Sequence, residues 1–276
     1  MLNALTIDVE DYFQVGAFTK TIPISDWEKW EFRVEASTET ILQILEDAGV
    51  KGTFFTLGWI AQKAPQLVKR IAANGHTVAS HGFWHQWVYT QTEAAFREEV
   101  STTRKLLQDL SGQPVLSYRA PSFSITKKTP WAHRVLVEEG YLYDSSVFPI
   151  HHDVYGNPDA PPRIHRIETE AGPLVEFPPA IVKVLGQNIP TGGGGYFRLF
   201  PFAVTRWMLQ SINTAGNPFV FYMHPWEVDP DQPRVSGAPL KSRLRHYLNL
   251  KRTVPRFKRL LQTFSFAPME EILKTH

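Results

Sequence analysis

Short apolar runs alternate with longer amphipathic segments through the first half of this chain. The apolar runs are 4–9, 52–57, 77–80, 116–119 and 142–144, and segments with helical periodicity separate them. Strands that alternate with helices are typical of βαβ units, in which neighbouring strands run parallel. The pattern therefore predicts an α/β fold with a parallel sheet. Polar residues that follow the runs are expected at the carboxyl edge of that sheet, where such folds build their sites.

The second half of the chain is less regular. From about 148 to 198 it is rich in Pro and Gly, which predicts loops with one hairpin-like segment. A helix over 202–214 and a strongly apolar strand over 218–223 follow. Because no repeat or linker divides the sequence, we expect a single domain over 1–276 with a C-terminal helical extension from about 228.

Composition excludes several classes of protein. The chain has no cysteine, so any metal site must use His, Asp or Glu. Its net charge of +2 arises from Lys and Arg spread along the chain, without a basic arm of the kind that binds nucleic acid. No apolar run approaches the roughly 20 residues of a membrane span, so we expect no integral membrane segment.

The N-terminus lacks a basic region followed by an apolar run, which predicts that there is no signal peptide and that the location is cytoplasmic. A basic amphipathic helix over 254–263 has two interpretations. It is either a peripheral contact with a membrane surface or a solvated basic face, and the second is the commoner outcome. Oligomeric state is not legible in the sequence.

Two histidines, His81 and His85, stand four residues apart directly after the run 77–80. On one helical turn, residues with this spacing project from the same side, so two imidazoles can reach one divalent cation. A pair of this kind is more often structural or surface-exposed than metal-binding. The metal interpretation therefore depends on support from other segments.

Three carboxylates, Asp8, Glu10 and Asp11, cluster where the first apolar run ends. A solvated acidic turn would account for them. However, acids packed together at the end of a buried strand raise one another's pKa unless cations neutralise them. The candidate cations are a metal shared with the histidine pair and the guanidinium of Arg119.

Three further polar residues close apolar strands. Arg119 needs an anionic partner if it is buried, either in an active site or in a structural ion pair. Asp144 needs a similar explanation, and helix capping or loop hydrogen bonding would serve equally well. His224 follows the strand at 218–223 and, taken alone, would be read as a satisfied core histidine.

In this order, the segments resemble the five motifs of the polysaccharide deacetylase family, the family 4 carbohydrate esterases with a NodB homology domain. The motifs are Asp8-Val-Glu-Asp11, Ser80-His81-Gly-Phe-Trp-His85, Arg119-Ala-Pro121-Ser122, Asp144-Ser-Ser-Val-Phe148 and the segment ending in His224. Segments 8–15, 193–198 and 224–227 further resemble the subfamily encoded with exosortase and exopolysaccharide gene clusters. The resemblance implies a distorted (β/α) barrel with about seven parallel strands.

The resemblance also implies a metal centre. A divalent metal would be held by His81, His85 and one carboxylate, with Zn²⁺ preferred and Co, Ni, Fe or Mn as alternatives. We expect the carboxylate to be Asp11, because Asp is the residue type of the family, and Glu10 is the alternative. Asp8 matches the catalytic base.

The remaining roles follow from the same resemblance. His224 would protonate the departing amine, Arg119 would orient the base, and Asp144 would keep His224 charged and aimed. The expected substrate-binding residues are Pro121, Ser122 and Trp226. The third motif departs from the family, because Ser122 and Phe123 follow Pro121 where the family usually has Tyr. A backbone N–H, rather than a phenol, would therefore serve the oxyanion.

The predicted function is metal-dependent removal of N-acetyl groups from the N-acetylated amino sugars of a polysaccharide, in exopolysaccharide biosynthesis. Two alternatives stay open. One is a metal-independent, allantoinase-like amidohydrolase on the same scaffold, and the other is a non-catalytic carbohydrate-binding relative. The intact histidine pair favours the metal-dependent deacetylase over the metal-independent amidohydrolase. A candidate residue for every catalytic role argues against the non-catalytic relative.

Overall fold

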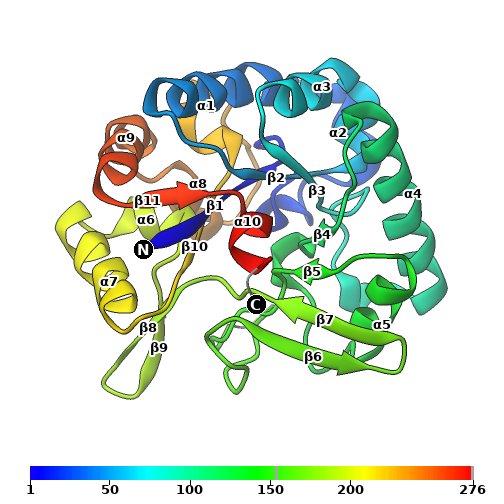
Figure 1. The fold of residues 1–276 in the computed structure, drawn as a ribbon. Coiled ribbons are helices and arrows are strands. Elements are labelled where there is room, and N and C mark those ends of the chain that lie inside the picture. Colours follow the sequence, from blue (N-terminus) through cyan, green and yellow to red (C-terminus); the bar gives the residue numbers. More distant parts are fainter. Residues whose placement is uncertain (153–154, 275–276) are drawn as a thin grey trace.

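The computed structural model describes residues 1–152 and 155–274 (Figure 1). Within this described part, seven parallel strands follow one another in the order β10-β1-β2-β3-β4-β5-β7. Their bounds are β1 Leu2–Val9, β2 Thr53–Thr56, β3 Thr77–Ser80, β4 Ser117–Tyr118, β5 Tyr143–Asp144, β7 Gly172–Glu176 and β10 Val220–Met223.

A parallel bridge between Pro179 and Val220 joins the segment after β7 to β10 and brings the two ends of the sheet together. The predicted α/β fold and its distorted barrel of parallel strands are therefore confirmed. None of the helices in the described ranges is both long and apolar enough to cross a bilayer.

Helices of the first half cover the outside of this sheet (Figure 1). They are α1 Val34–Ala48, α2 Gly58–Lys63, α3 Pro65–Ala73, α4 Glu93–Ser111 and α5 Trp131–Glu138. The helical segment between β2 and β3 is divided at Ala64 into α2 and α3, because the residue before Pro65 is pushed out of the helical region.

The second half adds more regular structure than the sequence predicts. Its further elements are β6 His165–Thr169, β8 Ile181–Val184, β9 Gln187–Pro190, α6 Gly194–Leu199, α7 Phe202–Thr214, α8 Leu240–Tyr247, α9 Thr253–Thr263, β11 Ser265–Ala267 and α10 Met269–Leu273. The segment beyond 228 is not purely helical, because β11 pairs in parallel with β1. The single-domain expectation remains a prediction.

Strand β1 lies between β10 and β2, which pair with Ala4–Ile7 and Thr6–Val9 and so fix which of its side chains point to each face of the sheet. Side chains alternate across a strand, and Leu5, Ile7 and Val9 accordingly pack into the apolar core. The alternate positions carry buried polar side chains, Asp8 among them. This register brings polar residues of β1 beside the segments that follow β3 and β10.

Candidate functional site

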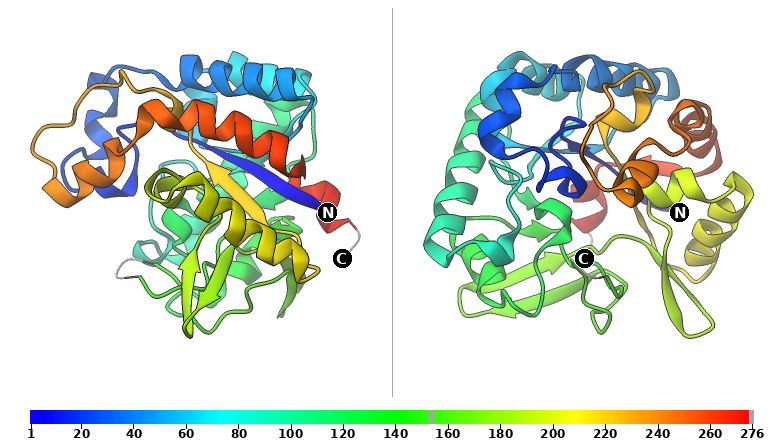
Figure 2. Two further views of the ribbon diagram at one scale, coloured as in Figure 1. Left: turned by 90° about the vertical axis from the view of Figure 1, so that its left-hand side faces the viewer. Right: turned by 180° about the vertical axis from the view of Figure 1, so that it is seen from behind.

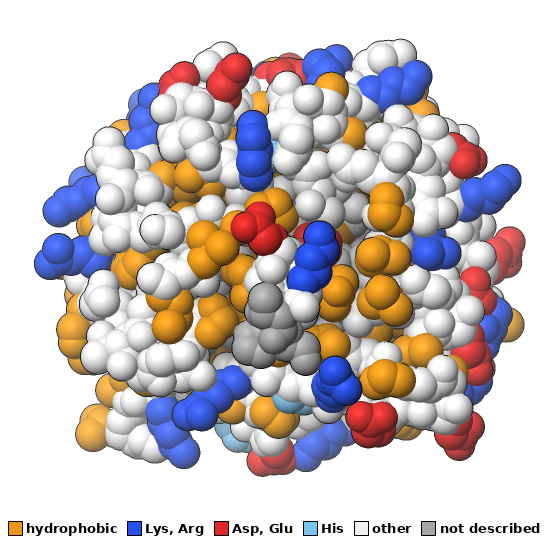
Figure 3. Space-filling view, viewed as in Figure 1, with side chains coloured by type: hydrophobic (Ala, Val, Ile, Leu, Met, Phe, Trp, Pro, Cys, Tyr) orange, Lys and Arg blue, Asp and Glu red, His pale blue; other side chains and the backbone are white. Residues whose placement is uncertain are grey.

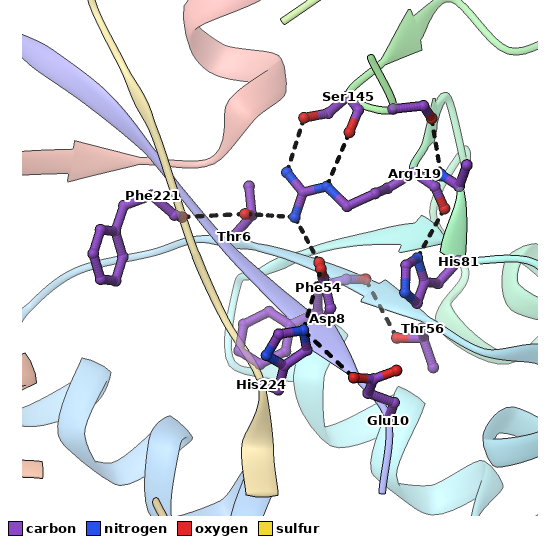
Figure 4. A network of polar contacts seen from close by, with 12 residues as sticks. Thr6, Asp8, Glu10, Phe54, Thr56, His81, Arg119, Ser145, Phe221 and His224 are labelled. Atoms are coloured by element: carbon purple, nitrogen blue, oxygen red, sulfur yellow. Dashed lines mark hydrogen bonds and ion pairs between the residues drawn. The ribbon is translucent and has the colours of Figure 1, made fainter. Parts of the chain in front are cut away.

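Asp8 is held by the fully buried guanidinium of Arg119, which follows β4 (Figure 4). Arg119 Nη1 donates to Asp8 Oδ1 at 2.5 Å and to Thr6 Oγ1 at 2.8 Å. Its Nε and Nη2 donate to the backbone and side-chain oxygens of Ser145 at 3.2 Å and 2.9 Å. Four hydrogen bonds therefore fix the guanidinium, and the predicted contact between Arg119 and Asp8 is present.

Glu10, His81 and His85 form a buried cluster whose ligand atoms lie within 4.8 Å of one another. Glu10 Oε2 is 2.7 Å from His85 Nε2, and the Trp226 indole donates to Glu10 Oε1 at 3.3 Å. The Nδ1–H of His81 donates to the Arg119 carbonyl at 2.8 Å, which leaves Nε2 of that ring to face the cluster.

This donor set fits a divalent metal. Two imidazoles and one carboxylate are the protein ligands of a catalytic zinc site that keeps a coordination position open. Burial lowers the pKa of His81 to about 4, although the nearby charge of Asp8 opposes this, so the ring is neutral at neutral pH and able to ligate. Burial alone would raise the pKa of Glu10, but the charges of His85 and His224 bring it down to about 2.

The two histidines do not lie on a helical turn, which corrects that part of the prediction. They lie in a loop after β3, where Gly82 has a φ of 73° and His85 a φ of 52°. These left-handed residues fold the loop back on itself, and the imidazole centroids end 5.4 Å apart. The spacing therefore brings the rings together by a different backbone path.

Asp11 is not part of the cluster, and the preference for it over Glu10 is corrected. Its Oδ2 accepts the backbone N–H groups of Arg33 at 2.7 Å and Val34 at 2.9 Å, at the start of α1. Its Oδ1 accepts the N–H of Tyr12 at 2.8 Å. Strand β1 ends at Val9, and the Glu10 N–H bonds back to the Asp8 carbonyl at 3.0 Å. In the turn that follows, Glu10 lies beside the imidazoles while Asp11 bonds to the start of α1.

His224 faces both carboxylates of this pocket. Its Nε2 is 3.4 Å from Glu10 Oε1 and 3.9 Å from Asp8 Oδ2, and its Nδ1 is 2.8 Å from Glu227 Oε1. Burial lowers the pKa of His224, but the charge of Glu10 and the bond to Glu227 outweigh it and raise the value to about 9. The imidazole is therefore protonated at neutral pH.

The partner of His224 is Glu227 rather than Asp144, and the sequence reasoning missed it. Glu227 is in turn bound by the buried Arg198, whose Nε donates to Glu227 Oε2 at 2.6 Å. Burial would raise the pKa of Glu227, but Arg198 and His224 lower it to about 2. The signal was the three-residue spacing in His-Pro-Trp-Glu, which lets a side chain reach back to the start of a helical turn.

The glycine run before Arg198 allows the backbone that carries Arg198 to approach strand β10. Gly193 bridges to Tyr222 of β10, and a Cβ at Gly193 would lie 1.8 Å from the Tyr222 carbonyl oxygen. Only glycine allows the two backbones to meet so closely. The run thus places α6, and with it Arg198, beside Glu227.

Asp144 lies on the other side of the sheet, which corrects its predicted role. It forms a second buried group with His133 of α5 and Glu176 of β7, here called the α5 cluster. His133 Nε2 is 3.5 Å from Asp144 Oδ2, and Ser146 donates to Asp144 Oδ1. Burial, and then the charge of Asp144, raises the pKa of Glu176 well above its usual range. This group is remote from His224.

We call Asp8, Glu10, His81, His85 and His224 the pocket cluster. They line a cavity of about 160 Å³ together with Ser122 and Trp226. Trp226 stacks on the His224 ring, with centroids 5.1 Å apart and planes at 18°. Ser122 has a φ of 52°, so its backbone is held in a left-handed turn. Pro121 is buried beneath this turn and does not line the cavity.

Comparison with known families agrees with this site. Residues 27–139 match the polysaccharide deacetylase domain, and residues 145–274 match a domain of unknown function, DUF3473. The first half of the chain therefore carries a domain similar to that of the polysaccharide deacetylases.

The curated relatives that match this chain are deacetylases by name. A peptidoglycan-N-acetylglucosamine deacetylase of Bacillus cereus is 35% identical over 96 residues, which are 34% of this chain and 35% of that protein. A peptidoglycan-N-acetylmuramic acid deacetylase of Bacillus subtilis is 27% identical over 120 residues, 44% of each chain. The matches thus span less than half of these relatives.

Solved structures show the same fold. A candidate polysaccharide deacetylase of Mycobacterium smegmatis aligns over 99% of this chain and 89% of its own, with a TM-score of 0.61 and 22% identity. An allantoinase aligns over 99% and 88%, with a TM-score of 0.63 and 15% identity. At these identities the likeness concerns the fold alone.

Proposed function

We propose that this protein is a metal-dependent deacetylase that hydrolyses the N-acetyl groups of amino sugars in a polysaccharide. The observation that carries the proposal is the pocket cluster. One cavity combines a carboxylate fixed by arginine, two imidazoles with a further carboxylate, and a protonated imidazole. Amide hydrolysis needs a base for the attacking water, an electrophile for the carbonyl oxygen and an acid for the departing nitrogen. These groups could supply all three.

Glu10, His81 and His85 would hold the metal. When bound, a divalent cation supplies a Lewis acid for the amide carbonyl and lowers the pKa of water. The proposal takes Glu10 as the carboxylate ligand, because Glu10 Oε2 lies beside the imidazoles. Zn²⁺ suits this donor set, and Co, Ni, Fe and Mn suit it as well.

Asp8 would accept the proton of the attacking water. Arg119 holds Asp8 Oδ1, so Oδ2 is the oxygen turned toward His224 and the cavity. His224 would then donate its Nε2 proton to the sugar nitrogen as the C–N bond breaks, and acetate and a free amine result. Glu227 stabilises the imidazolium through its Nδ1–H and keeps that proton on Nδ1 once Nε2 has donated its own. The Ser122 backbone N–H is the candidate second donor to the oxyanion.

The substrate proposed is an N-acetylated exopolysaccharide or its oligosaccharides. Support comes from the family match and from the resemblance of segments 8–15, 193–198 and 224–227 to the exosortase-associated subfamily. The names of the curated relatives add peptidoglycan as a comparison substrate.

The experiment is metal analysis of the purified protein paired with acetate release from N-acetylglucosamine oligomers, before and after chelation. We expect about one metal ion per chain, loss of acetate release with a chelator, and its return with Zn²⁺. An active protein that ignores the chelator would favour the allantoinase-like alternative, and allantoin hydrolysis would then be measured. A protein that retains metal and binds the oligomers without releasing acetate would be the non-catalytic relative.

A further inference from the structure

The charges of this chain are unevenly distributed along the sequence. Residues 232–269 contain nine Lys and Arg and no Asp or Glu. The whole chain has 29 basic and 27 acidic residues, so the remainder has 20 against 27 and is acidic. The face in Figure 3, by contrast, shows Lys and Arg interspersed with Asp and Glu. One contiguous segment therefore supplies the excess of positive over negative charge in this chain.

Helix α8 lies inside this segment and exposes its apolar face to solvent, which an ordinary surface helix does not do. Leu240 and Leu244 are 69% and 63% exposed, and Leu248, one turn further, is 36% exposed. An amphipathic helix normally packs such a stripe, spaced by four residues, against the core. Here the buried residue is His246, while the leucines face solvent.

Basic side chains flank this stripe. Lys241, Arg243 and Arg245 are all exposed, and α8 has no acid to pair with them. Leu199 of α6, 54% exposed, lines a cavity with Leu248 and Arg245 and extends the apolar edge. A stripe of leucines bordered by cations is the pattern of a helix that lies in the interface of a membrane.

Helix α8 is fixed rigidly to the catalytic pocket. Arg198 Nη1 donates to the carbonyls of His246 and Leu248 at 2.8 Å each, while its Nε holds Glu227. The His246 ring also stacks on Trp226, with centroids 4.1 Å apart. Any surface that α8 touches is therefore oriented relative to the pocket cluster.

The helix also lies at the catalytic end of the barrel. In the left view of Figure 2, β1 runs from the N-terminus toward the side where the orange segment with α8 projects. Tyr155 and Tyr222 line both the catalytic cavity and the cavity at Arg245 and Leu248. A surface bound by α8 would face the mouth of the pocket.

We propose that α8 docks this protein on an anionic phospholipid bilayer. The leucines enter the headgroup region, and the flanking cations contact lipid phosphates. Charge complementarity favours an anionic surface, and the exposed leucines favour a lipid over a soluble polyanion, which would gain nothing from them. The inference goes beyond the proposed function and needs no catalytic activity.

The test is cosedimentation of the purified full chain with vesicles. We expect binding to phosphatidylcholine vesicles that contain about one third phosphatidylglycerol, weaker binding in high salt, and little binding to pure phosphatidylcholine. Replacing both Leu240 and Leu244 by Ser should weaken binding at least about tenfold. The control is Leu185→Ser, since Leu185 is fully exposed on the remote β8–β9 turn.

Variants that remove basic side chains provide an independent test of vesicle binding. Lys241→Gln with Arg243→Gln should weaken vesicle binding about fivefold for each charge removed, whereas Lys183→Gln on β8 should not. All substituted side chains are exposed, and thermal melts check that each variant is folded. Trp fluorescence with and without vesicles measures the same affinities without centrifugation.

Three outcomes would overturn the proposal. The first is no binding to anionic vesicles. The second is binding that the charge variant weakens while the leucine variant does not, together with equal binding to a soluble polyanion. The third is a dimer in solution that the leucine variant dissociates, because the stripe would then bind a second copy of this chain.

Discussion

Two buried clusters of carboxylates and imidazoles lie at carboxyl ends of strands in the same sheet, and they differ in how their charge is balanced. In the pocket cluster, Arg119 and a protonated His224 face Asp8 and Glu10. In the α5 cluster, the one imidazole or cation grouped with Asp144 and Glu176 among the residues that the structure describes is His133, 3.5 Å from Asp144. One cluster lines a cavity, and the other lies between the sheet and α5.

Buried acids alone therefore do not mark a site. Carboxylates stay charged when cations are built in beside them, as at Glu10, whose pKa is about 2. Without such cations a proton is retained, as at Glu176, whose pKa burial raises. The two clusters therefore differ in whether their carboxylates are ionised and can take part in chemistry. The four predictions that follow test this contrast, beginning with the largest effect.

Replacing His81 by Ala should have the largest effect, because it removes a metal donor from the pocket cluster. We expect bound metal to fall from about one per chain to near zero. Acetate release should fall by more than the roughly 100-fold that loss of an outer-shell partner costs. Elemental analysis and an acetate assay measure both. His133→Ala, in the α5 cluster, is the matched control and should retain its metal.

Replacing Glu227 by Gln should have the second-largest effect and should change turnover without changing metal content. The imidazolium of His224 loses its buried partner, so less of it is protonated at neutral pH, and acetate release should fall about 10–100-fold. Metal content should be unchanged, because Glu227 does not contact the donors. His224→Ala removes the imidazole altogether and gives the lowest turnover to be expected in this assay. Equal turnover in Glu227→Gln and the unaltered protein would contradict the assigned role.

Replacing Glu176 by Gln should change stability rather than turnover. The pKa of Glu176 is raised in the folded state, so its stabilising proton is fully present below about 4.5 and is lost as pH rises toward the folded value. The unaltered protein should therefore lose unfolding free energy over that range, by up to about 1.4 kcal/mol per pH unit. The variant lacks this slope and should be the more stable at pH 8. Denaturant melts at several pH values decide this, and a destabilised variant at pH 8 would mean that the carboxylate is ionised and paired.

Replacing Asp11 by Asn should have the smallest effect. Asp11 accepts three backbone N–H groups around the start of α1, and Asn can retain some of them. We expect a loss of about 0.5–2 kcal/mol in unfolding free energy, with metal content intact. Glu10→Gln is the contrasting variant and should lose metal. Loss of metal from Asp11→Asn would restore the ligand set expected from the sequence.

Much of this arrangement could be predicted from local patterns. Alternation of strands and helices indicated the parallel sheet, and the buried Arg119 indicated an acidic partner, which is Asp8. The sequence analysis preferred Asp11 on family residue type, whereas the structure places Glu10 beside the imidazoles. The strand ends at Val9, so its two-residue period does not decide between the two carboxylates.

Other contacts depend on long-range packing. The link between Arg198 and Glu227 joins two segments that only the fold brings together, and no local pattern encodes it. Asp144 ends a strand as Asp8 does, yet faces the helix layer, and the sequence alone does not reveal which side of the sheet it takes. Helix α8 lies within the predicted helical extension, but the exposure of its leucines was not predicted, because an apolar stripe normally indicates packing against a core.

The pairing of β1 with β10 and β11 has a consequence for synthesis on the ribosome. Ala4 aligns with both Val220 and Ala267, so the strand that carries Asp8 is made first and acquires its neighbours last. Contacts of such sequence separation form slowly and leave the early chain without its final partners. The pocket cluster therefore cannot be assembled until the segments from β10 to β11 have left the exit tunnel, and shorter nascent chains would lack the complete cluster.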